Sequence, residues 1–227
     1  HDEKHRCRGV VASFEDVTEL DRKQKELRDA LNSLKQSSEE IRQQNRELEW
    51  LATRDALTGC VNRRSFFKIF ETAWDGTRSE NRVLSAMVVD VDHFQAINDN
   101  YGHAKGDEVL RKVAAAIMKT ISEDDVVCRY GGEEFSVFMP DTNLDEAELR
   151  AERIRLAIKA LVTDNIRITA SLGVSSIVQN ATSPQDLLDQ ADKCLFVAKR
   201  HGRNQVVRFD KATTQIAQLG DSTAPER

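Results

Sequence analysis

A seven-residue hydrophobic repeat runs through residues 17–52, a stretch that contains neither glycine nor proline. Its apolar positions are Leu20, Leu27, Leu34, Ile41 and Leu48, and the interleaved positions are Gln24, Leu31, Ser38, Asn45 and Ala52. A narrow apolar seam kept over several heptads is typical of a parallel dimeric coiled coil, in which a polar Asn45 would fix the register and weaken the coil. A single amphipathic helix packed on its own domain is the alternative, although such a helix normally has a wider apolar face.

Residues 54–210 alternate between strand-like and helix-like stretches. Short apolar runs predict strands, and apolar residues that recur every three or four positions predict helices. The predicted strands are residues 83–91, 126–130, 135–139, 166–176 and 205–209, and the predicted helices are residues 63–74, 107–121, 145–162 and 184–201. This order predicts an α+β domain with a palm-like, ferredoxin-like βαββαβ core, in which residues 126–139 form a hairpin.

The two ends of the chain carry weaker patterns. Gly9–Phe14 is a short apolar run that suits one strand, and Asp16 or Thr18 could cap the helix that follows. This run resembles the last strand of a PAS sensor domain, with a disordered end as the alternative. The sequence thus predicts a PAS-like end over residues 1–18, the helix over 17–52, a globular domain over 53–210 and a disordered tail over 211–227.

Composition narrows the classes of function. The formal net charge is −5, so a nucleic-acid polymer is an unexpected ligand, whereas a single nucleotide needs only a few local cations. No apolar run is long enough to span a membrane, and no signal-peptide pattern is present. The four cysteines lie far apart without a CxxC pair, which favours reduced thiols in a cytoplasmic protein over a zinc site.

Four carboxylates are candidates for chemistry. Asp90 and Asp92 lie at the end of the apolar run 83–91, and Glu133 and Glu134 lie at the tip of the predicted hairpin. Residues two apart on a strand share a face, so Asp90 and Asp92 should point the same way. Buried carboxylates require a cation or hydrogen-bond donors, and carboxylates from two adjacent strands suit Mg²⁺ or Mn²⁺. A strand end that simply reaches solvent is the alternative for the two aspartates.

Gly131 and Gly132 would let a ligand approach their backbone closely, although plain hairpins also use Gly-Gly turns. Their surroundings, Arg129-Tyr-Gly-Gly-Glu-Glu-Phe135, resemble the GGEEF variant of the GGDEF family of diguanylate cyclases, and the resemblance covers about residues 50–210. The other matching motifs are Asp55-Ala-Leu-Thr-Gly-Cys-Val-Asn-Arg63, Asp90-Val-Asp-His-Phe94, Asn98-Asp99, Tyr101-Gly-His103, Gly106-Asp107, Ala170-Ser-Leu-Gly-Val174, Ala191-Asp192 and Ala198-Lys-Arg-His-Gly-Arg-Asn204.

The resemblance implies roles for the acidic residues. Asp90 and Glu133 would bind Mg²⁺ or Mn²⁺ with the carbonyl group of Val91. Glu133 and Glu134 are the catalytic candidates, and Glu134 would orient or deprotonate the ribose 3′-hydroxyl of GTP.

The resemblance also implies how GTP is held. Asn98 and Asp107 would read the guanine edge, where a carboxylate accepts two hydrogen bonds that adenine does not offer; Asp107 could also cap the following helix. Lys199 and Arg203 would hold the β- and γ-phosphates from one side of a helix, with an exposed basic helix end as the alternative. The remaining implied substrate-binding residues are Phe94, Gly131 and Gly132.

One departure from the family concerns its inhibitory product site, RxxD. The aspartate position is Asp125, but the arginine position is Ser122, and Arg153 stands where the family often has an auxiliary arginine. The acidic stretch 122–125 would repel a bis-phosphate ligand, so product inhibition should be weak or absent. In a second departure, Phe196 replaces a common tyrosine, which should matter little.

The sequence therefore predicts an enzyme, a nucleotidyltransferase that condenses two GTP molecules into cyclic di-GMP across a homodimer. The coiled coil would join the two domains and link them to an upstream sensor. The alternatives are a catalytically silent GTP-binding or docking module and a dimerising transmission fragment.

Overall fold

The computed structural model describes residues 18–80, 82–164 and 166–210, and the chain divides into two compact units between Trp50 and Leu51. The described part of the first unit belongs to a single helix, α1 (Thr18–Thr53), as predicted. The predicted PAS-like strand over Gly9–Phe14 and the tail over 211–227 lie outside the described residues.

Helix α1 presents its heptad leucines and isoleucine to its surface. Each of the five first-seam side chains is between 57% and 69% exposed in the single chain. Ion pairs within the helix, such as the 2.9 Å contact of Lys23 with Glu19, add small local support. The helix is as predicted, and its pairing with a second copy remains a prediction.

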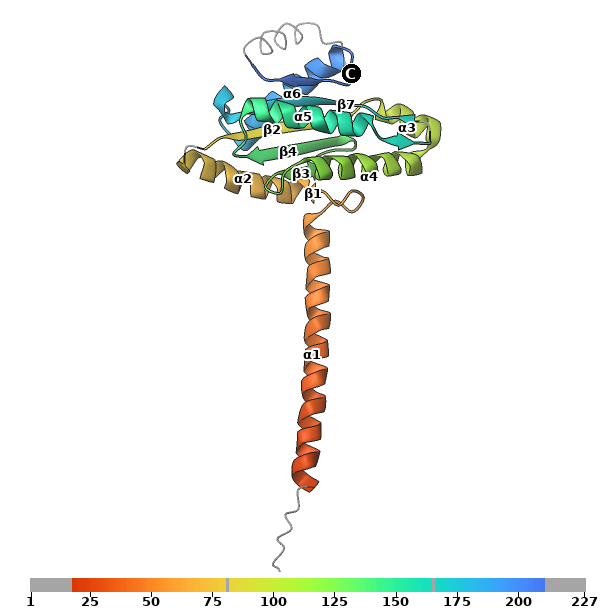
Figure 1. The fold of residues 1–227 in the computed structure, drawn as a ribbon, viewed down its shortest axis with the longest axis vertical. Helices are drawn as coiled ribbons and strands as arrows, with labels where there is room; N and C mark the ends of the chain where they lie inside the picture. The colour runs from red at the N-terminus through yellow and green to blue at the C-terminus, as the bar shows by residue number, and fades with distance from the viewer. Residues whose placement is uncertain (1–17, 81, 165, 211–227) are drawn as a thin grey trace, which may run out of the picture. The chain divides into compact units, whose positions relative to one another are not determined.

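The second unit contains a six-stranded sheet in the order β1-β3-β4-β2-β7-β8 (Figure 1). Its strands are β1 (Val61–Asn62), β2 (Leu84–Val91), β3 (Val126–Arg129), β4 (Glu134–Pro140), β7 (Ala170–Ser176) and β8 (Val206–Arg208). The four central strands are antiparallel to their neighbours in the ferredoxin-like order, while the edge strands β1 and β8 join in parallel. The predicted fold class is confirmed.

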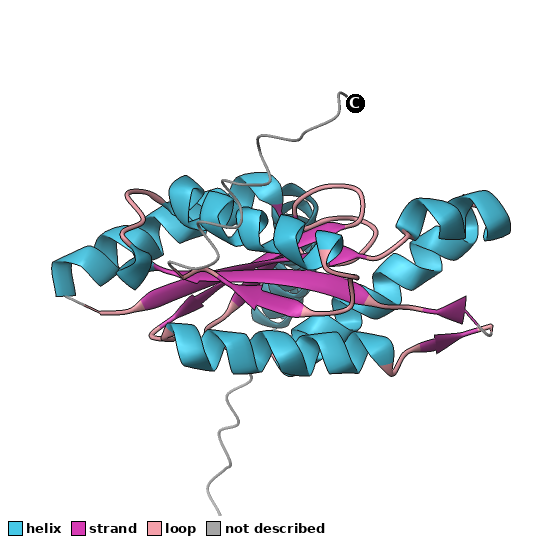
Figure 2. Cartoon of the chain, turned by 90° about the horizontal axis from the view of Figure 1, so that it is seen from above, coloured by secondary structure: helices cyan, strands magenta, loops and turns pink. Residues whose placement is uncertain are grey.

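Helices cover both faces of this sheet (Figure 2). They are α2 (Arg63–Glu80), α3 (Phe94–Tyr101), α4 (His103–Thr120), α5 (Leu144–Lys159) and α6 (Pro184–Arg200), with a 3₁₀ turn, η1 (Ile177–Gln179). Among these described helices, none is both long enough and apolar enough to cross a membrane, and the same holds for α1.

Three predicted boundaries are wrong. Helix α4 begins at His103, because Gly102 (φ 81°) separates it from α3, a short helix that the sequence patterns did not predict. The predicted strand 166–176 is broken into β6 (Ile166–Arg167) and β7. Strand β6 instead pairs with β5 (Val162–Thr163) in a separate two-stranded hairpin, which also shortens the predicted helix 145–162.

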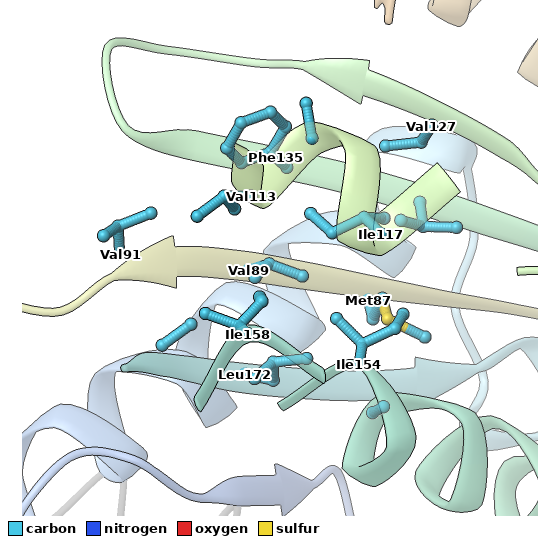
Figure 3. Packing of buried hydrophobic residues seen from close by; sticks show 14 of the residues in the cluster. Met87, Val89, Val91, Val113, Ile117, Val127, Phe135, Ile154, Ile158 and Leu172 are labelled. Carbon is cyan, nitrogen blue, oxygen red and sulfur yellow. The ribbon is translucent and has the colours of Figure 1, made fainter. Parts of the chain in front are cut away.

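Side chains along β2 alternate between two hydrophobic cores. Met87, Val89 and Val91 pack with α4 and α5, as Figure 3 shows, while Ala86 and Val88 pack with α2 and α6. The next position of the second series is Asp90, which therefore falls on the α6 side of the sheet. The alternation of side chains along β2 thus directs Asp90 toward α6, the helix that carries Lys199.

Helix α6 lies unusually close to β7 at Gly173. A Cβ atom at this position would lie 1.9 Å from the carbonyl oxygen of Ala191 and 2.3 Å from the amide nitrogen of Leu195. Only a residue without a side chain permits this approach. The lack of a side chain at Gly173 therefore allows α6 to pack this close to the sheet.

Candidate functional site

The predicted metal ligands and catalytic glutamates lie together at one end of the sheet. Asp90 is paired in register with Glu134 across the β2–β4 ladder and is only 4% exposed. The amide of Val91 donates a hydrogen bond to the carbonyl oxygen of Glu133 over 3.3 Å. Two adjacent antiparallel strands thus bring three carboxylates to the same place, as the split βαβ order predicts.

Burial and mutual repulsion disfavour ionisation of these carboxylates. Burial raises the pKa of Asp90, and the nearby Lys199 offsets only part of this effect. Burial, followed by the charge of Asp90, raises the pKa of Glu133 and of Glu134. Burial also raises the pKa of Asp192 on α6. A cluster of this kind gains from an additional positive charge.

A pocket of about 180 Å³ opens beside these carboxylates. It brings together six of the predicted site residues, namely Asp90, Val91, Phe94, Glu133, Lys199 and Arg203. Asp92, also a candidate from the sequence, completes the lining with His93 and Gln95, to which the sequence patterns gave no role. His93 has φ 57°, which turns the chain from β2 into α3.

Lys199 and Arg203 both reach the pocket, but not from one side of a helix as predicted. Lys199 lies in the last turn of α6, and its Nζ atom is 2.7 Å from Oδ2 of Asp90. The helix ends at Arg200, and Arg203 has φ 62° in the following turn. Gly202 (φ 106°) redirects the chain there, so the turn places Arg203.

The predicted guanine-reading residues lie on the α3–α4 pair, outside the lining of the pocket. A Cβ atom at Gly106 would lie 1.9 Å from Oδ1 of Asn98 and 3.1 Å from Cζ of Phe94, so Asn98 packs directly on the residue before Asp107. Phe94 and Asn98 share one side of α3. The interpretation of Asp107 as a helix cap is wrong, because the residue preceding α4 is Gly102.

Asp92 has a different environment from Asp90. Its carboxylate accepts hydrogen bonds from the hydroxyl groups of Thr169 and Ser171, each over 2.7 Å, and from the amide of Asn204 over 3.0 Å. It is 5% exposed. Protein donors therefore satisfy the Asp92 carboxylate, which is one of the two outcomes predicted for it, and a cation at Asp90 stays a prediction.

The hairpin tip is held by a side chain that the sequence patterns did not single out. The guanidinium group of Arg129 donates to the carbonyl oxygen of Gly132 over 2.7 and 3.0 Å and lies 3.5 Å from Oδ1 of Asp55. A Cβ atom at Gly131 would lie 2.9 Å from Oε2 of Glu134, so this carboxylate folds back over the turn. The absence of a side chain at Gly131 thus leaves room for Glu134, and a ligand against the backbone of Gly131 and Gly132 stays a prediction.

The degenerate inhibitory position contains an internal ion pair. Nη1 of Arg150 lies 2.8 Å from both carboxylate oxygens of Asp125, and the amide of Ser122 donates to the same carboxylate over 2.8 Å. The Asp125 side chain is 1% exposed, whereas Arg153 is exposed on α5. Arg150 thus compensates the charge of Asp125, and repulsion of a bis-phosphate ligand by the acidic stretch 122–125 stays a prediction.

The chain is similar to known proteins in both sequence and fold. Residues 52–205 match the protein family described as diguanylate cyclase, GGDEF domain. The chain is 40% identical over 163 residues to the response regulator PleD of Caulobacter vibrioides, covering 69% of this chain and 36% of PleD. It is 40% identical over 162 residues to the diguanylate cyclase DgcM of Escherichia coli, covering 71% of this chain and 39% of DgcM. It thus spans well under two thirds of these relatives.

Solved structures agree with the sequence matches. The coiled coil and GGDEF domain of DgcB from Caulobacter crescentus has a TM-score of 0.72 at 28% identity, covering 80% of this chain and 98% of that chain. The active GGEEF domain of a diguanylate cyclase from Vibrio cholerae has a TM-score of 0.64 at 34% identity, covering 67% and 98%. Helix α1 resembles the coiled-coil helix of DgcB. The chain therefore belongs to the GGDEF family of diguanylate cyclase domains.

Proposed function

We propose that this chain is an active diguanylate cyclase, which condenses two GTP molecules into cyclic di-GMP and releases two pyrophosphates. The observation that supports this most directly is the meeting of Asp90, Glu134 and Lys199 at one end of the sheet, through strand register and a 2.7 Å ion pair. A nucleotidyl transfer needs negative and positive groups of this kind around a triphosphate.

A divalent cation fits the carboxylates of this site. Asp90 and Glu133 offer hard oxygen ligands, and burial without full charge compensation raises the pKa of both. Within the described residues, no group of three or more His, Cys, Asp or Glu side chains is already assembled as a metal cage. Mg²⁺ and Mn²⁺ take few protein carboxylates and keep water and substrate phosphates in their shell. Asp90, Glu133 and the Val91 carbonyl would hold the ion, which when bound neutralises phosphate charge.

GTP would be selected by the α3–α4 pair. The carboxylate of Asp107 can accept from the N1–H and the exocyclic amine of guanine, and the Asn98 amide can donate and accept beside it. Phe94 connects the pocket with the α3–α4 pair, since it lines the pocket and also packs near Gly106 on α4. This arrangement supports a preference for GTP over ATP.

The remaining groups would act on the reacting atoms. Lys199 and Arg203 would hold the β- and γ-phosphates, and the backbone of Gly131 and Gly132 would lie against the nucleotide. Glu134 would take the proton of the 3′-hydroxyl group as its oxygen attacks the α-phosphorus of the other GTP. The bond from that phosphorus to the bridging oxygen then breaks, and pyrophosphate leaves.

Ring closure requires two such sites to face each other, because cyclic di-GMP is two-fold symmetric. A homodimer joined through α1 in a parallel coiled coil would supply that symmetry and a high local concentration of the second site. The exposed heptad side chains of α1 support this pairing. A PAS-like domain upstream would then change the register or rotation of the coil, which the polar positions Gln24, Ser38 and Asn45 could permit.

The second candidate is a GGDEF module that binds GTP or docks partners without turnover. The full set of Asp90, Glu133, Glu134 and Lys199 disfavours it, since each position with a chemical role is filled. Comparing Glu134→Ala with the unaltered chain in a GTP turnover assay separates the two functions. A cyclase loses product formation in the variant, whereas a silent module forms no product in either protein.

A further inference from the structure

The turn that carries Arg203 has an unfavourable backbone conformation. Arg203 and Asn204 are consecutive residues with φ 62° and φ 48°, directly after Gly202. A non-glycine residue in the left-handed region costs about 1 kcal/mol or more and persists only where its surroundings fix it. Contacts around this turn must therefore stabilise the conformation.

Asn204 is held by three hydrogen bonds, one to Asp92 and two from Arg155. Its amide donates to Oδ2 of Asp92 over 3.0 Å. Nη1 of Arg155 donates to Oδ1 of Asn204 over 2.7 Å and to its carbonyl oxygen over 3.3 Å. The amide of Arg203 donates to the carbonyl oxygen of Ala198 over 3.0 Å, which ties the turn back to α6.

The two anchors of this arrangement are themselves fixed. Asp92 is 5% exposed and accepts from the hydroxyl groups of Thr169 and Ser171. The Arg155 side chain is 11% exposed and pairs with both carboxylate oxygens of Glu152, over 2.8 and 2.6 Å. A bidentate pair of this kind holds the guanidinium plane in one orientation. The end of β2 and the middle of α5 thus act as rigid supports for the turn.

We infer that Asn204, Arg155 and Asp92 form a clamp that positions Arg203 in the nucleotide pocket. Arg203 and Asp92 line that pocket, whereas Arg155 and Asn204 do not. Arg155 and Asn204 therefore act through Arg203 and are positioning residues, with Asp92 as their anchor at the pocket wall. This inference rests on the proposed function, because it assigns the clamp to recognition of the β- and γ-phosphates of GTP.

The clamp makes a prediction that a purely structural role does not. Loss of the clamp should weaken binding of a triphosphate and leave binding of a monophosphate unchanged, because guanine is read on the α3–α4 pair. Asn204→Gly is the sharpest variant, since glycine tolerates the positive φ and keeps the backbone contacts while removing Oδ1. Arg155→Met removes the guanidinium group that donates to Oδ1 of Asn204. Lys159→Met, on the exposed end of α5, is the matched control.

Calorimetry with GMP and with the α,β-methylene analogue of GTP, in the presence of Mg²⁺, tests the clamp. We expect Asn204→Gly and Arg155→Met to bind the analogue about ten- to a hundredfold more weakly, with GMP affinity unchanged within about twofold. Adding Asn204→Gly to Arg203→Ala should cause no further loss, because both changes remove one interaction. Lys159→Met should bind both ligands normally.

Three results would overturn the inference. The first is an equal loss of GMP and analogue affinity, and the second is an additive loss in the double variant. The third is unchanged analogue binding by a folded Asn204→Gly protein, with folding checked by urea unfolding. Failure of the unaltered chain to bind the analogue would instead contradict the proposed function, and the clamp with it.

Discussion

Lys199 and Asp90 form an ion pair of 2.7 Å between α6 and β2, so the predicted phosphate-binding lysine and the predicted metal ligand are electrostatically coupled. Asp90 is almost completely buried, and Lys199 lowers a pKa that burial raises. Removal of Lys199 should therefore raise the pKa of Asp90 further. The site is better described as one charged unit than as separate metal and phosphate subsites.

Replacing Lys199 with methionine should lower turnover of GTP at least about a hundredfold, because it removes a phosphate contact and leaves Asp90 without its neighbouring cation. Arg200→Met is the matched control, since Arg200 lies over the ring of Phe196 at 5.7 Å and does not line the pocket. The turnover of both variants is measured as the rate of pyrophosphate release from GTP. Equal losses in the two proteins would contradict a specific role for Lys199.

The close approach of α6 to β7 predicts that Gly173→Ala destabilises the domain. The added methyl group would overlap the backbone at Ala191 and Leu195, which should cost about 1–3 kcal/mol of unfolding free energy. Gly76→Ala in α2 is the control, because a Cβ atom there meets nothing within 4 Å and alanine favours a helix. Urea unfolding compares the two. If both variants are as stable as the unaltered chain, the packing described at Gly173 is wrong.

Much of the fold follows from local pattern. The heptad repeat predicted α1, and the apolar run 83–91 predicted β2 with Asp90 at its end. The Gly131-Gly132 pair between two apolar runs predicted the β3–β4 hairpin. The βαββαβ order then predicted that Glu134 lies beside Asp90. These features depend on periodicity and connection order, which a sequence contains.

The features that were missed depend on tertiary contacts. The pairing of Arg150 with Asp125 and of Arg155 with Asn204 depends on which side of α5 faces the sheet end. The helix carries a third arginine, Arg153, and local pattern alone does not tell the three apart. Helix α3 begins after His93, whose left-handed backbone conformation no sequence pattern indicated. The turn at Arg203 was mistaken for helix, although Gly202 is a common signal for a helix end.

Cyclic di-GMP should inhibit this chain weakly, because Arg150 occupies the carboxylate of Asp125 and Ser122 supplies no guanidinium group. Submicromolar inhibition of GTP turnover by added cyclic di-GMP would contradict this. The double variant Ser122→Arg with Arg150→Ala should gain inhibition, since it releases Asp125 and restores the missing arginine. Ser122→Arg alone should gain less, because Arg150 still competes for the carboxylate.

Turnover should depend on pairing of α1. Leu27→Asn with Leu34→Asn introduces polar groups into the apolar seam, which should give monomers by analytical ultracentrifugation and lower turnover about a hundredfold at micromolar concentration. Lys35→Gln, at an exposed position outside both seams, is the control. Strengthening the coil with Ser38→Leu and Asn45→Leu should also change the rate. Unchanged turnover in forced monomers or in the strengthened coils would contradict the coupling.

The most direct test is incubation of the chain with GTP and Mg²⁺, followed by chromatographic separation of the nucleotides. An active cyclase predicts cyclic di-GMP with two pyrophosphates for each molecule formed, no comparable reaction of ATP, and loss of the product in Glu134→Ala. GTP that is bound yet remains intact, or that is converted only to GDP, would contradict the account and identify the chain as a silent nucleotide-binding module.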